Sequence, residues 1–141
     1  VYGLALCYHY THEEAILPLF ERVTKYFIDH LPEDYVPYWD LIFSDGSCEP
    51  RDTSAAAIAA CGILEMEKYY HNQEFLDIAK KMMSSLSEKY TTVDYLQSNG
   101  IIKDGMYSRK HGHKSECTSW GDYFYLEALM RMKKSDWKIY W

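Results

Sequence analysis

The chain of 141 residues is long enough for one domain or a piece of one, and its 48% hydrophobic content is sufficient for an ordinary core, which argues against disorder. Its net charge of −6 argues against a nucleic-acid partner, which usually requires a basic face. No apolar run approaches the ~20 residues that span a bilayer, and the sequence shows no signal peptide.

The first thirty residues predict two helices. Residues 1–10 are apolar nearly all round and indicate the end of a buried helix whose start is missing, so the chain is expected to be the C-terminal part of something longer. Thr11 offers an N-cap for a second, amphipathic helix that runs to His30. Pro18 is expected to bend that helix or to delay its effective start.

A small-residue helix dominates the middle of the chain. The connection 31–51 is long, as functional loops in compact domains often are. It leads to Asp52, whose carboxylate is a good N-cap for a helix over 52–70 that contains five alanines near its start. A helix with so little side-chain volume is stable only where other helices approach it closely. We therefore predict an interior helix whose polar first residues, Arg51 to Ser54, face a site.

The last seventy residues repeat this order. An amphipathic helix is predicted over 73–89, followed by a long connection over 90–119, in which Ile101 and Ile102 lie between two turn signals and favour a short strand. A third apolar helix starts at Trp120, and the aromatic tail 136–141 is expected to dock on the body.

The alternation of inner helix, outer helix and long connection predicts repeated helical hairpins. In such an array the inner helices run in the same direction. Their N-terminal ends and the long connections then lie on one face, where several positive helix ends surround a binding site.

Several motifs give the sequence a family resemblance. The stretch 50–60 (PRDTSAAAIAA) and the stretch 120–129 (WGDYFYLEAL) resemble the unsaturated glucuronyl hydrolases of glycoside hydrolase family 88. Shorter segments resemble the same family in the same order, so the resemblance covers essentially the whole chain; they are residues 2–6, 31–34, 36–40 and 137–141.

The resemblance implies an all-α fold of (α/α)6-barrel type, of which residues 1–141 form the C-terminal part, about two and a half hairpins. It implies removal of a Δ4,5-unsaturated uronic acid from lyase-generated, glycosaminoglycan-derived oligosaccharides by hydration of the vinyl-ether double bond, with no metal or cofactor. The family's catalytic aspartates match positions before Tyr2, so the resemblance assigns no catalytic residue to this chain and implies that it is inactive alone.

Seven residues are predicted to bind substrate. Asp52 is an N-cap first, and its neighbours at the helix start would face the sugar. Three residues match the position of a family segment that contacts the sugar beyond the scissile bond, although the family's Ser/Lys spacing is not preserved and a preference for sulfated substrates does not follow. Trp120 is either core or a stacking platform. The seven are Arg51, Asp52, Thr53, His111, His113, Lys114 and Trp120.

The four cysteines are scattered along the chain. None of the four forms a CxxC pair, and His111, His113 and Cys117 lack zinc-finger spacing, so a metal site is not predicted. Cys7 and Cys61 are interpreted as buried apolar residues. Free thiols suit a reducing compartment, and we expect a cytoplasmic location.

Two other functions fit the pattern. One is a related barrel that acts on unsaturated rhamnogalacturonan disaccharides. The other is a non-catalytic helical-repeat module that binds a protein partner.

Overall fold

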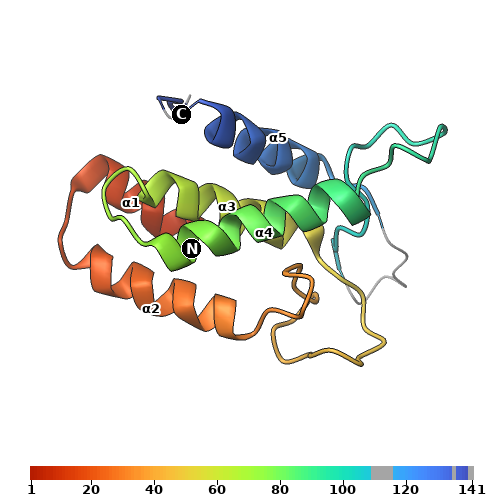
Figure 1. The fold of residues 1–141 in the computed structure, drawn as a ribbon, viewed down its shortest axis with the longest axis horizontal. Helices are drawn as coiled ribbons and strands as arrows, with labels where there is room; N and C mark the ends of the chain where they lie inside the picture. Colours follow the sequence, from red (N-terminus) through yellow and green to blue (C-terminus); the bar gives the residue numbers. More distant parts are fainter. Residues whose placement is uncertain (109–115, 135, 140–141) are drawn as a thin grey trace.

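The computed structural model describes residues 1–108, 116–134 and 136–139 and is helical (Figure 1). Over these residues five helices form and no strand does; the segments between helices contain only isolated β-bridges. The helices are α1 (Tyr2–Thr11), α2 (Ile16–Asp29), α3 (Thr53–Met66), α4 (Gln73–Lys89) and α5 (Ser119–Lys133). Two hairpins and a fifth helix agree with the predicted fold class.

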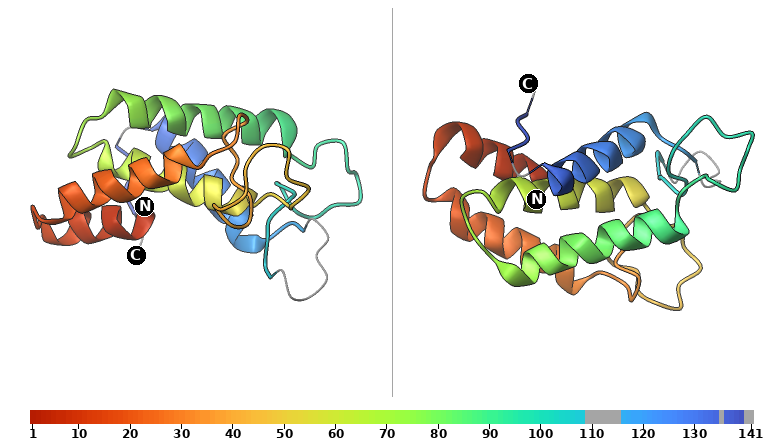
Figure 2. Two further views of the ribbon diagram at one scale, coloured as in Figure 1. Left: turned by 90° about the horizontal axis from the view of Figure 1, so that it is seen from below. Right: turned by 45° about the horizontal axis from the view of Figure 1, so that its top comes forward.

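The helices form an inner and an outer layer. The inner helices α1, α3 and α5 run in one direction, and the outer helices α2 and α4 run back against them (Figures 1 and 2). Helix α3 is central, because it packs against α1, α4 and α5. The connection 30–52 and the described segments 90–108 and 116–118 lie at the end where α3 and α5 begin (Figure 1). The predicted common direction of the inner helices is confirmed.

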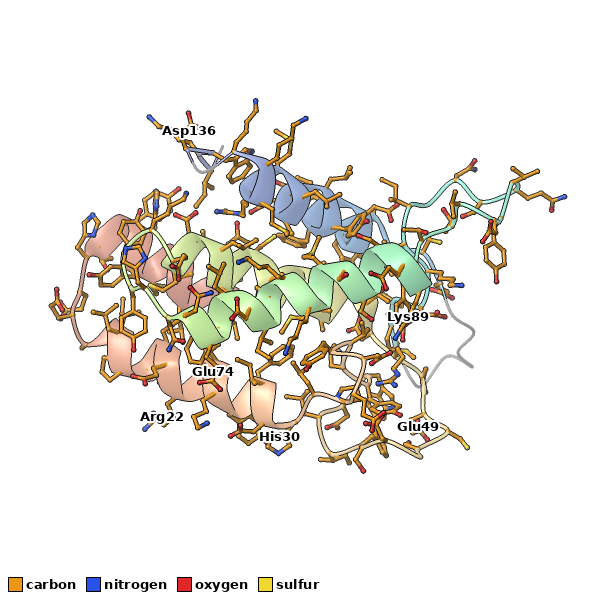
Figure 3. All side chains as sticks on the ribbon, viewed as in Figure 1. Arg22, His30, Glu49, Glu74, Lys89 and Asp136 are labelled. Atoms are coloured by element: carbon orange, nitrogen blue, oxygen red, sulfur yellow. The ribbon has the colours of Figure 1, made fainter. Side chains whose placement is uncertain are left out.

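The small residues of α3 allow this close packing. Nearly every alanine of the helix is buried, and Gly62 lies against the backbone of Tyr2, where an added Cβ would be 2.6 Å from the Tyr2 Cα atom. The outer helices present one apolar face each and keep charges such as Arg22 on α2 and Glu74 on α4 exposed (Figure 3). The core between the layers includes Phe20, Ile63, Met82, Met83 and Leu86.

The boundary between α1 and α2 differs from the prediction. Thr11 is the last residue of α1, not the N-cap of α2, and its hydroxyl donates to the Cys7 carbonyl oxygen at 2.7 Å. Helix α1 ends because His12 adopts a left-handed conformation (φ 51°). Helix α2 begins at Ile16, so Pro18 falls in its first turn, where a missing N–H costs nothing. The delayed start is confirmed.

Three smaller predictions had different outcomes. Cys61 is fully buried, as expected, but Cys7 is exposed. Ile102 forms only an isolated bridge with Thr91 and not a strand. The described part of the tail, residues 136–139, docks on the body, since Trp137 is buried and the centre of its indole ring lies 4.4 Å from the Arg131 guanidinium. None of the described helices is long and apolar enough to cross a membrane.

Candidate functional site

The predicted site lies where α3 and α5 begin side by side. We call this end, made of the first turns of α3 and α5 with segments 30–52 and 90–108, the loop face (Figure 1). The Trp120 indole N–H on α5 donates to Ser54 Oγ on α3 at 3.2 Å and so links the two helix starts directly. Both starts are capped by side chains, Asp52 on α3 and Thr118 on α5.

Asp52 is an N-cap, as predicted. Its Oδ1 atom accepts hydrogen bonds from the backbone N–H of Ser54 and Ala55 and, at 2.6 Å, from the Ser54 hydroxyl. The Met106 N–H also donates to Oδ1, at 3.4 Å. One carboxylate oxygen therefore fixes the start of α3 and holds the 90–108 segment against it.

Arg51 is engaged within its own loop. Its guanidinium donates to the Val36 carbonyl oxygen at 2.8 Å, lies 3.5 Å from Asp34 Oδ1 and stacks 4.0 Å above the Tyr38 ring. The Tyr90 hydroxyl donates to the other Asp34 oxygen at 2.7 Å. Burial and this contact to a carboxylate raise the pKa of Tyr90. These contacts join the 30–52 segment to the end of α4 and assign Arg51 a positioning role in the described structure.

Thr53 is fully buried. Its hydroxyl donates to the Lys103 carbonyl oxygen at 2.8 Å, and its backbone N–H donates to the Asp104 carbonyl oxygen at 3.1 Å. Thr53 thus holds the 90–108 segment against the start of α3. Direct contact between Thr53 and a sugar stays an untested prediction, and the geometry favours an indirect role.

Trp120 is the most exposed of the four predicted residues that the structure describes. Its side chain is 37% exposed, and Tyr107, which is 71% exposed, lies with its ring centroid 6.0 Å away. The bond from the indole N–H to Ser54 holds the ring at the helix start. A fixed, half-exposed aromatic face of this kind can pack against the apolar face of a sugar ring.

The remaining predicted residues, His111, His113 and Lys114, lie outside the described residues. The described parts on either side are anchored, because Gly105 pairs with Glu116 in a β-bridge and the N–H groups of Ile101 and Ile102 donate to Asp122 Oδ1 at 2.9 and 3.0 Å. Asp122 therefore has a structural role in the first turn of α5.

The loop face offers binding groups more than reactive ones. Its described carboxylates Asp34, Asp52 and Asp122 each accept hydrogen bonds that position loops or cap helices. No group of three or more His, Cys, Asp or Glu side chains in the described structure is arranged to hold a metal ion. The arrangement is that of a wall that can hold a sugar.

A buried ionic network, which was not predicted from the sequence, links the start of α1 to the C-terminal halves of α3 and α5. The Arg131 guanidinium on α5 donates to Glu65 on α3 and to Glu127 Oε1, the latter at 2.8 Å. The Tyr2 hydroxyl on α1 donates to the same Glu127 oxygen at 2.5 Å. All four side chains are buried, so the network ties α1, α3 and α5 together. A Glu and an Arg four residues apart on an apolar helix were the signal for it.

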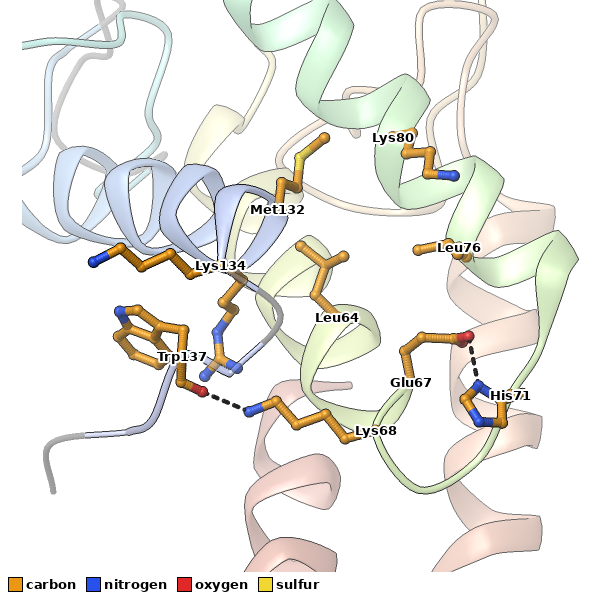
Figure 4. A pocket seen from close by; sticks show the side chains of 10 residues that line it. Leu64, Glu67, Lys68, His71, Leu76, Lys80, Met132, Lys134 and Trp137 are labelled. Carbon is orange, nitrogen blue, oxygen red and sulfur yellow. Dashed lines mark hydrogen bonds and ion pairs between the residues drawn. The ribbon is translucent and has the colours of Figure 1, made fainter.

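Two further side chains contact the carboxylate of Glu65. Lys68 Nζ lies 2.7 Å from Glu65 Oε2, and His9 Nδ1 lies 2.9 Å from Oε1. Burial alone would raise the pKa of Glu65, but the hydrogen bonds from Lys68 and Arg131 outweigh it, so that the pKa is lowered. Beside this network is a cavity of about 390 Å³, where Lys68 also donates to the Trp137 carbonyl oxygen at 2.9 Å (Figure 4).

The sequence is similar to known enzymes over its whole length. It is 43% identical to an unsaturated chondroitin disaccharide hydrolase of Streptococcus agalactiae and 45% identical to one of Streptococcus pneumoniae, with 100% of this chain aligned to 37% of each. An unsaturated glucuronyl hydrolase of Bacillus sp. strain GL1 is 36% identical over 95% of the chain. No family model matches the chain.

Solved structures of the same enzymes are also similar to this chain in fold. The crystal structure of the unsaturated glucuronyl hydrolase from S. agalactiae superposes with a TM-score of 0.92 over 99% of this chain and 39% of that one. The Bacillus sp. GL1 enzyme superposes with a TM-score of 0.87 over 95% and 37%. The chain spans about 37% of the length of the curated relatives, which fits the expectation of a partial barrel. By sequence and by fold, the whole chain is similar to one part of the unsaturated glucuronyl hydrolases.

Proposed function

We propose that this chain forms part of a glycoside hydrolase that removes a Δ4,5-unsaturated uronic acid from lyase-generated oligosaccharides. The observation that carries the proposal is the similarity of the whole chain, loop face included, to unsaturated chondroitin disaccharide hydrolases at 43–45% identity. In the proposed reaction, water adds across the vinyl-ether double bond of the uronic acid. The resulting hemiketal at C5 opens to a ketone and leaves a hemiacetal at the glycosidic carbon C1. This hemiacetal collapses to an aldehyde, which breaks the glycosidic bond and releases the remaining saccharide as an alcohol.

The role proposed for the described residues is substrate binding. Trp120 and Tyr107 provide exposed aromatic surface, while Arg51, Asp52 and Thr53 hold the loops that surround it. The starts of α3 and α5 add partial positive charge, which favours an anionic sugar. Proton transfer belongs in this proposal to aspartates outside the chain, since Asp34, Asp52 and Asp122 are engaged as caps and loop anchors.

The proposed substrates are glycosaminoglycan-derived. One solved relative is a variant of the S. agalactiae enzyme in complex with dGlcA-GalNAc6S, and another is a complex with dGlcA-Glc-Rha-Glc. Relatives therefore include complexes with saccharides of two different lengths. For the present chain we propose unsaturated glucuronyl disaccharides and longer oligosaccharides of this class.

A chimaeric enzyme tests the function directly. This chain would replace the aligned segment of the S. agalactiae enzyme, which is 43% identical. Incubation with an unsaturated chondroitin disaccharide is expected to abolish the ultraviolet absorbance of the conjugated double bond, whereas the 141-residue chain alone is expected to leave it unchanged. A folded chimaera that hydrolyses no unsaturated uronide would refute the assignment.

The same assay separates the alternatives. A preference for an unsaturated rhamnogalacturonan disaccharide would indicate the related barrel. A chimaera that folds but is inactive on every substrate would favour the non-catalytic protein-binding module. The similarity to glucuronyl and chondroitin hydrolases favours neither.

A cytoplasmic location is part of the proposal. It is supported by four free cysteines, three of them exposed, which suit a reducing compartment. Fractionation of the source cells should recover the protein with a cytoplasmic marker, and recovery from the culture medium would contradict this location.

A further inference from the structure

A cavity of about 400 Å³ lies beside the loop face. Its volume falls within the range of small-molecule sites, about 300–1,000 Å³. The residues that line it come from segment 92–104 and from the approach to α5; they are Thr92, Tyr95, Ser98, Lys103, Asp104 and Cys117.

Lys103 supplies this cavity with a cation, and Asp104 supplies a carboxylate to the same lining. Its Nζ atom lies 4.9 Å from the centroid of the Tyr95 ring, and no carboxylate of the described residues forms an ion pair with it. Its backbone is fixed on both sides, because its N–H donates to the Tyr90 carbonyl oxygen at 2.8 Å and its carbonyl oxygen accepts from the Thr53 hydroxyl. A held, half-buried ammonium group is suited to bind an oxyanion.

The other walls suit a sugar ring. Tyr95 is 57% exposed, so one part of its ring is available to the apolar face of a pyranose. The Thr92 hydroxyl is held by the Gly100 carbonyl oxygen at 2.5 Å, and Ser98 Oγ accepts from the Gly100 N–H at 3.2 Å. Ser98 Oγ also lies 3.6 Å from Cys117 Sγ, and its hydroxyl group can turn from this weak sulfur contact to donate to a ligand oxygen.

The cavity is continuous with the structure of the loop face. The carbonyl oxygens of Lys103 and Asp104 accept hydrogen bonds from Thr53 at the start of α3. Cys117, on the other wall, directly precedes Thr118, the N-cap of α5. The walls of the cavity are therefore tied to the starts of both α3 and α5.

We propose that the cavity binds one further sugar unit, bearing a carboxylate or a sulfate group, of an oligosaccharide longer than a disaccharide. Tyr95 packs against the ring, and Lys103 pairs with the anionic group. The inference rests on the proposed function, because it deepens the substrate class of the same site.

The chimaeric enzyme described above provides the test. Its Tyr95→Ala and Lys103→Gln variants would be compared on an unsaturated disaccharide and on tetrasaccharides of the same polymer, with and without sulfate. Tyr26→Ala is the matched aromatic control, since Tyr26 is also 57% exposed but lies on α2. Lys133→Gln, at the exposed end of α5, is the control for loss of a positive charge. Isothermal titration calorimetry would measure binding alongside turnover.

Each cavity variant is expected to raise KM for the tetrasaccharide about three- to tenfold, because a stacking contact or a charged hydrogen bond is lost. KM for the disaccharide and kcat should change by less than about twofold, which corresponds to ~0.4 kcal/mol. An effect of Lys103→Gln only on the sulfated tetrasaccharide identifies sulfate as the anion, and an equal effect on both identifies the carboxylate.

Two results would overturn the inference while the proposed function stands: unchanged tetrasaccharide kinetics in both variants, or equal losses on disaccharide and tetrasaccharide. If the chimaera hydrolyses neither substrate, the proposed function fails. In that case calorimetry tests the additional subsite on its own. Weaker tetrasaccharide binding by both cavity variants, and not by the controls, would support the subsite, and unchanged binding would refute it.

Discussion

At the scale of residues, Glu65 shows how a buried charge is stabilised in this fold. The residue has no exposed surface, yet Arg131 and Lys68 donate to its carboxylate and His9 lies at hydrogen-bond distance. A buried carboxylate left without such partners would be strongly destabilising. The interaction with two cations therefore decides its protonation state, and its pKa is lowered below the ordinary value of 4.5.

This shift predicts a pH-dependent loss of stability. Because the folded-state pKa of Glu65 lies below the unfolded-state value, its contribution is present above pH 4.5 and is lost as the pH falls through the folded-state pKa. Glu65→Gln should thus be less stable than the parent chain at pH 7, and the difference in unfolding free energy should shrink toward pH 3. Urea unfolding at several pH values measures this difference in unfolding free energy. Glu21→Gln, which removes an exposed carboxylate on α2, is the control. A difference that is constant with pH would contradict the assignment.

The roles of single residues were predictable only where they depend on the local sequence. Asp52 was recognisable as a cap because its position before an alanine-rich helix is a sequence feature, and the structure confirms it. Arg51 and Thr53 form their contacts with Asp34 and Lys103, seventeen and fifty residues away, so their supporting roles depend on the fold. The same is true of the pairing of Glu65 with Arg131.

At the scale of elements, the glycines of α1 and α3 occupy opposite environments. An added Cβ at Gly62 on α3 would lie 2.6 Å from the Tyr2 Cα atom and 2.7 Å from its backbone nitrogen. Gly3 on α1 has no atom within 4 Å of the same position. Backbone atoms cannot move aside as a flexible side chain can, so the closeness of α1 and α3 depends on Gly62.

The two positions therefore predict opposite effects of alanine. Gly62→Ala should destabilise the chain by about 1–3 kcal/mol, because overpacking outweighs the gain in helix propensity. Gly3→Ala should be neutral or stabilise by up to about 1 kcal/mol, because only propensity changes. Chemical denaturation of both variants tests this comparison. A Gly62→Ala variant as stable as Gly3→Ala would show that α1 is not held against α3 as described.

The element boundaries were predictable where capping and periodicity agree. Helix α4 was predicted over 73–89 and forms over the same residues, because Asn72 caps a strongly amphipathic segment. Helix α3 is shorter than the predicted 52–70 and ends at Met66. The boundary after α1 was wrong, because Thr11 donates back to Cys7 within α1 and so does not cap α2.

At the scale of the whole molecule, the open side of α5 sets the behaviour of the chain. The helix packs on α3 with one side and leaves a row of apolar residues partly exposed on the other. The exposed fraction of Leu126 is 47% and that of Met132 is 46%. The row consists of Tyr123, Leu126, Leu129 and Met132. Apolar surface of this kind marks an interaction face or promotes association.

The alternation of inner and outer helices, and with it the common direction of α1, α3 and α5, followed from the sequence, because small-residue and amphipathic helices differ in composition. The sequence did not predict what covers α5. The relatives are longer, since the chain aligns with only 37% of their length, and their additional residues can supply this cover. We therefore expect the open side of α5 to be buried in a protein of their size.

The final prediction compares the same substitution in two proteins. In the 141-residue chain, Leu126→Glu should reduce concentration-dependent association, because it places a charge in the exposed apolar row. In the chimaeric enzyme it should lower the unfolding free energy by at least about 2 kcal/mol, because the charge would be buried without a partner. Sedimentation velocity and chemical unfolding measure the two effects. Ile42→Glu, at a loop residue 77% exposed, is the control and should change neither. A Leu126→Glu chimaera of parental stability would mean that α5 stays open to solvent in the larger protein.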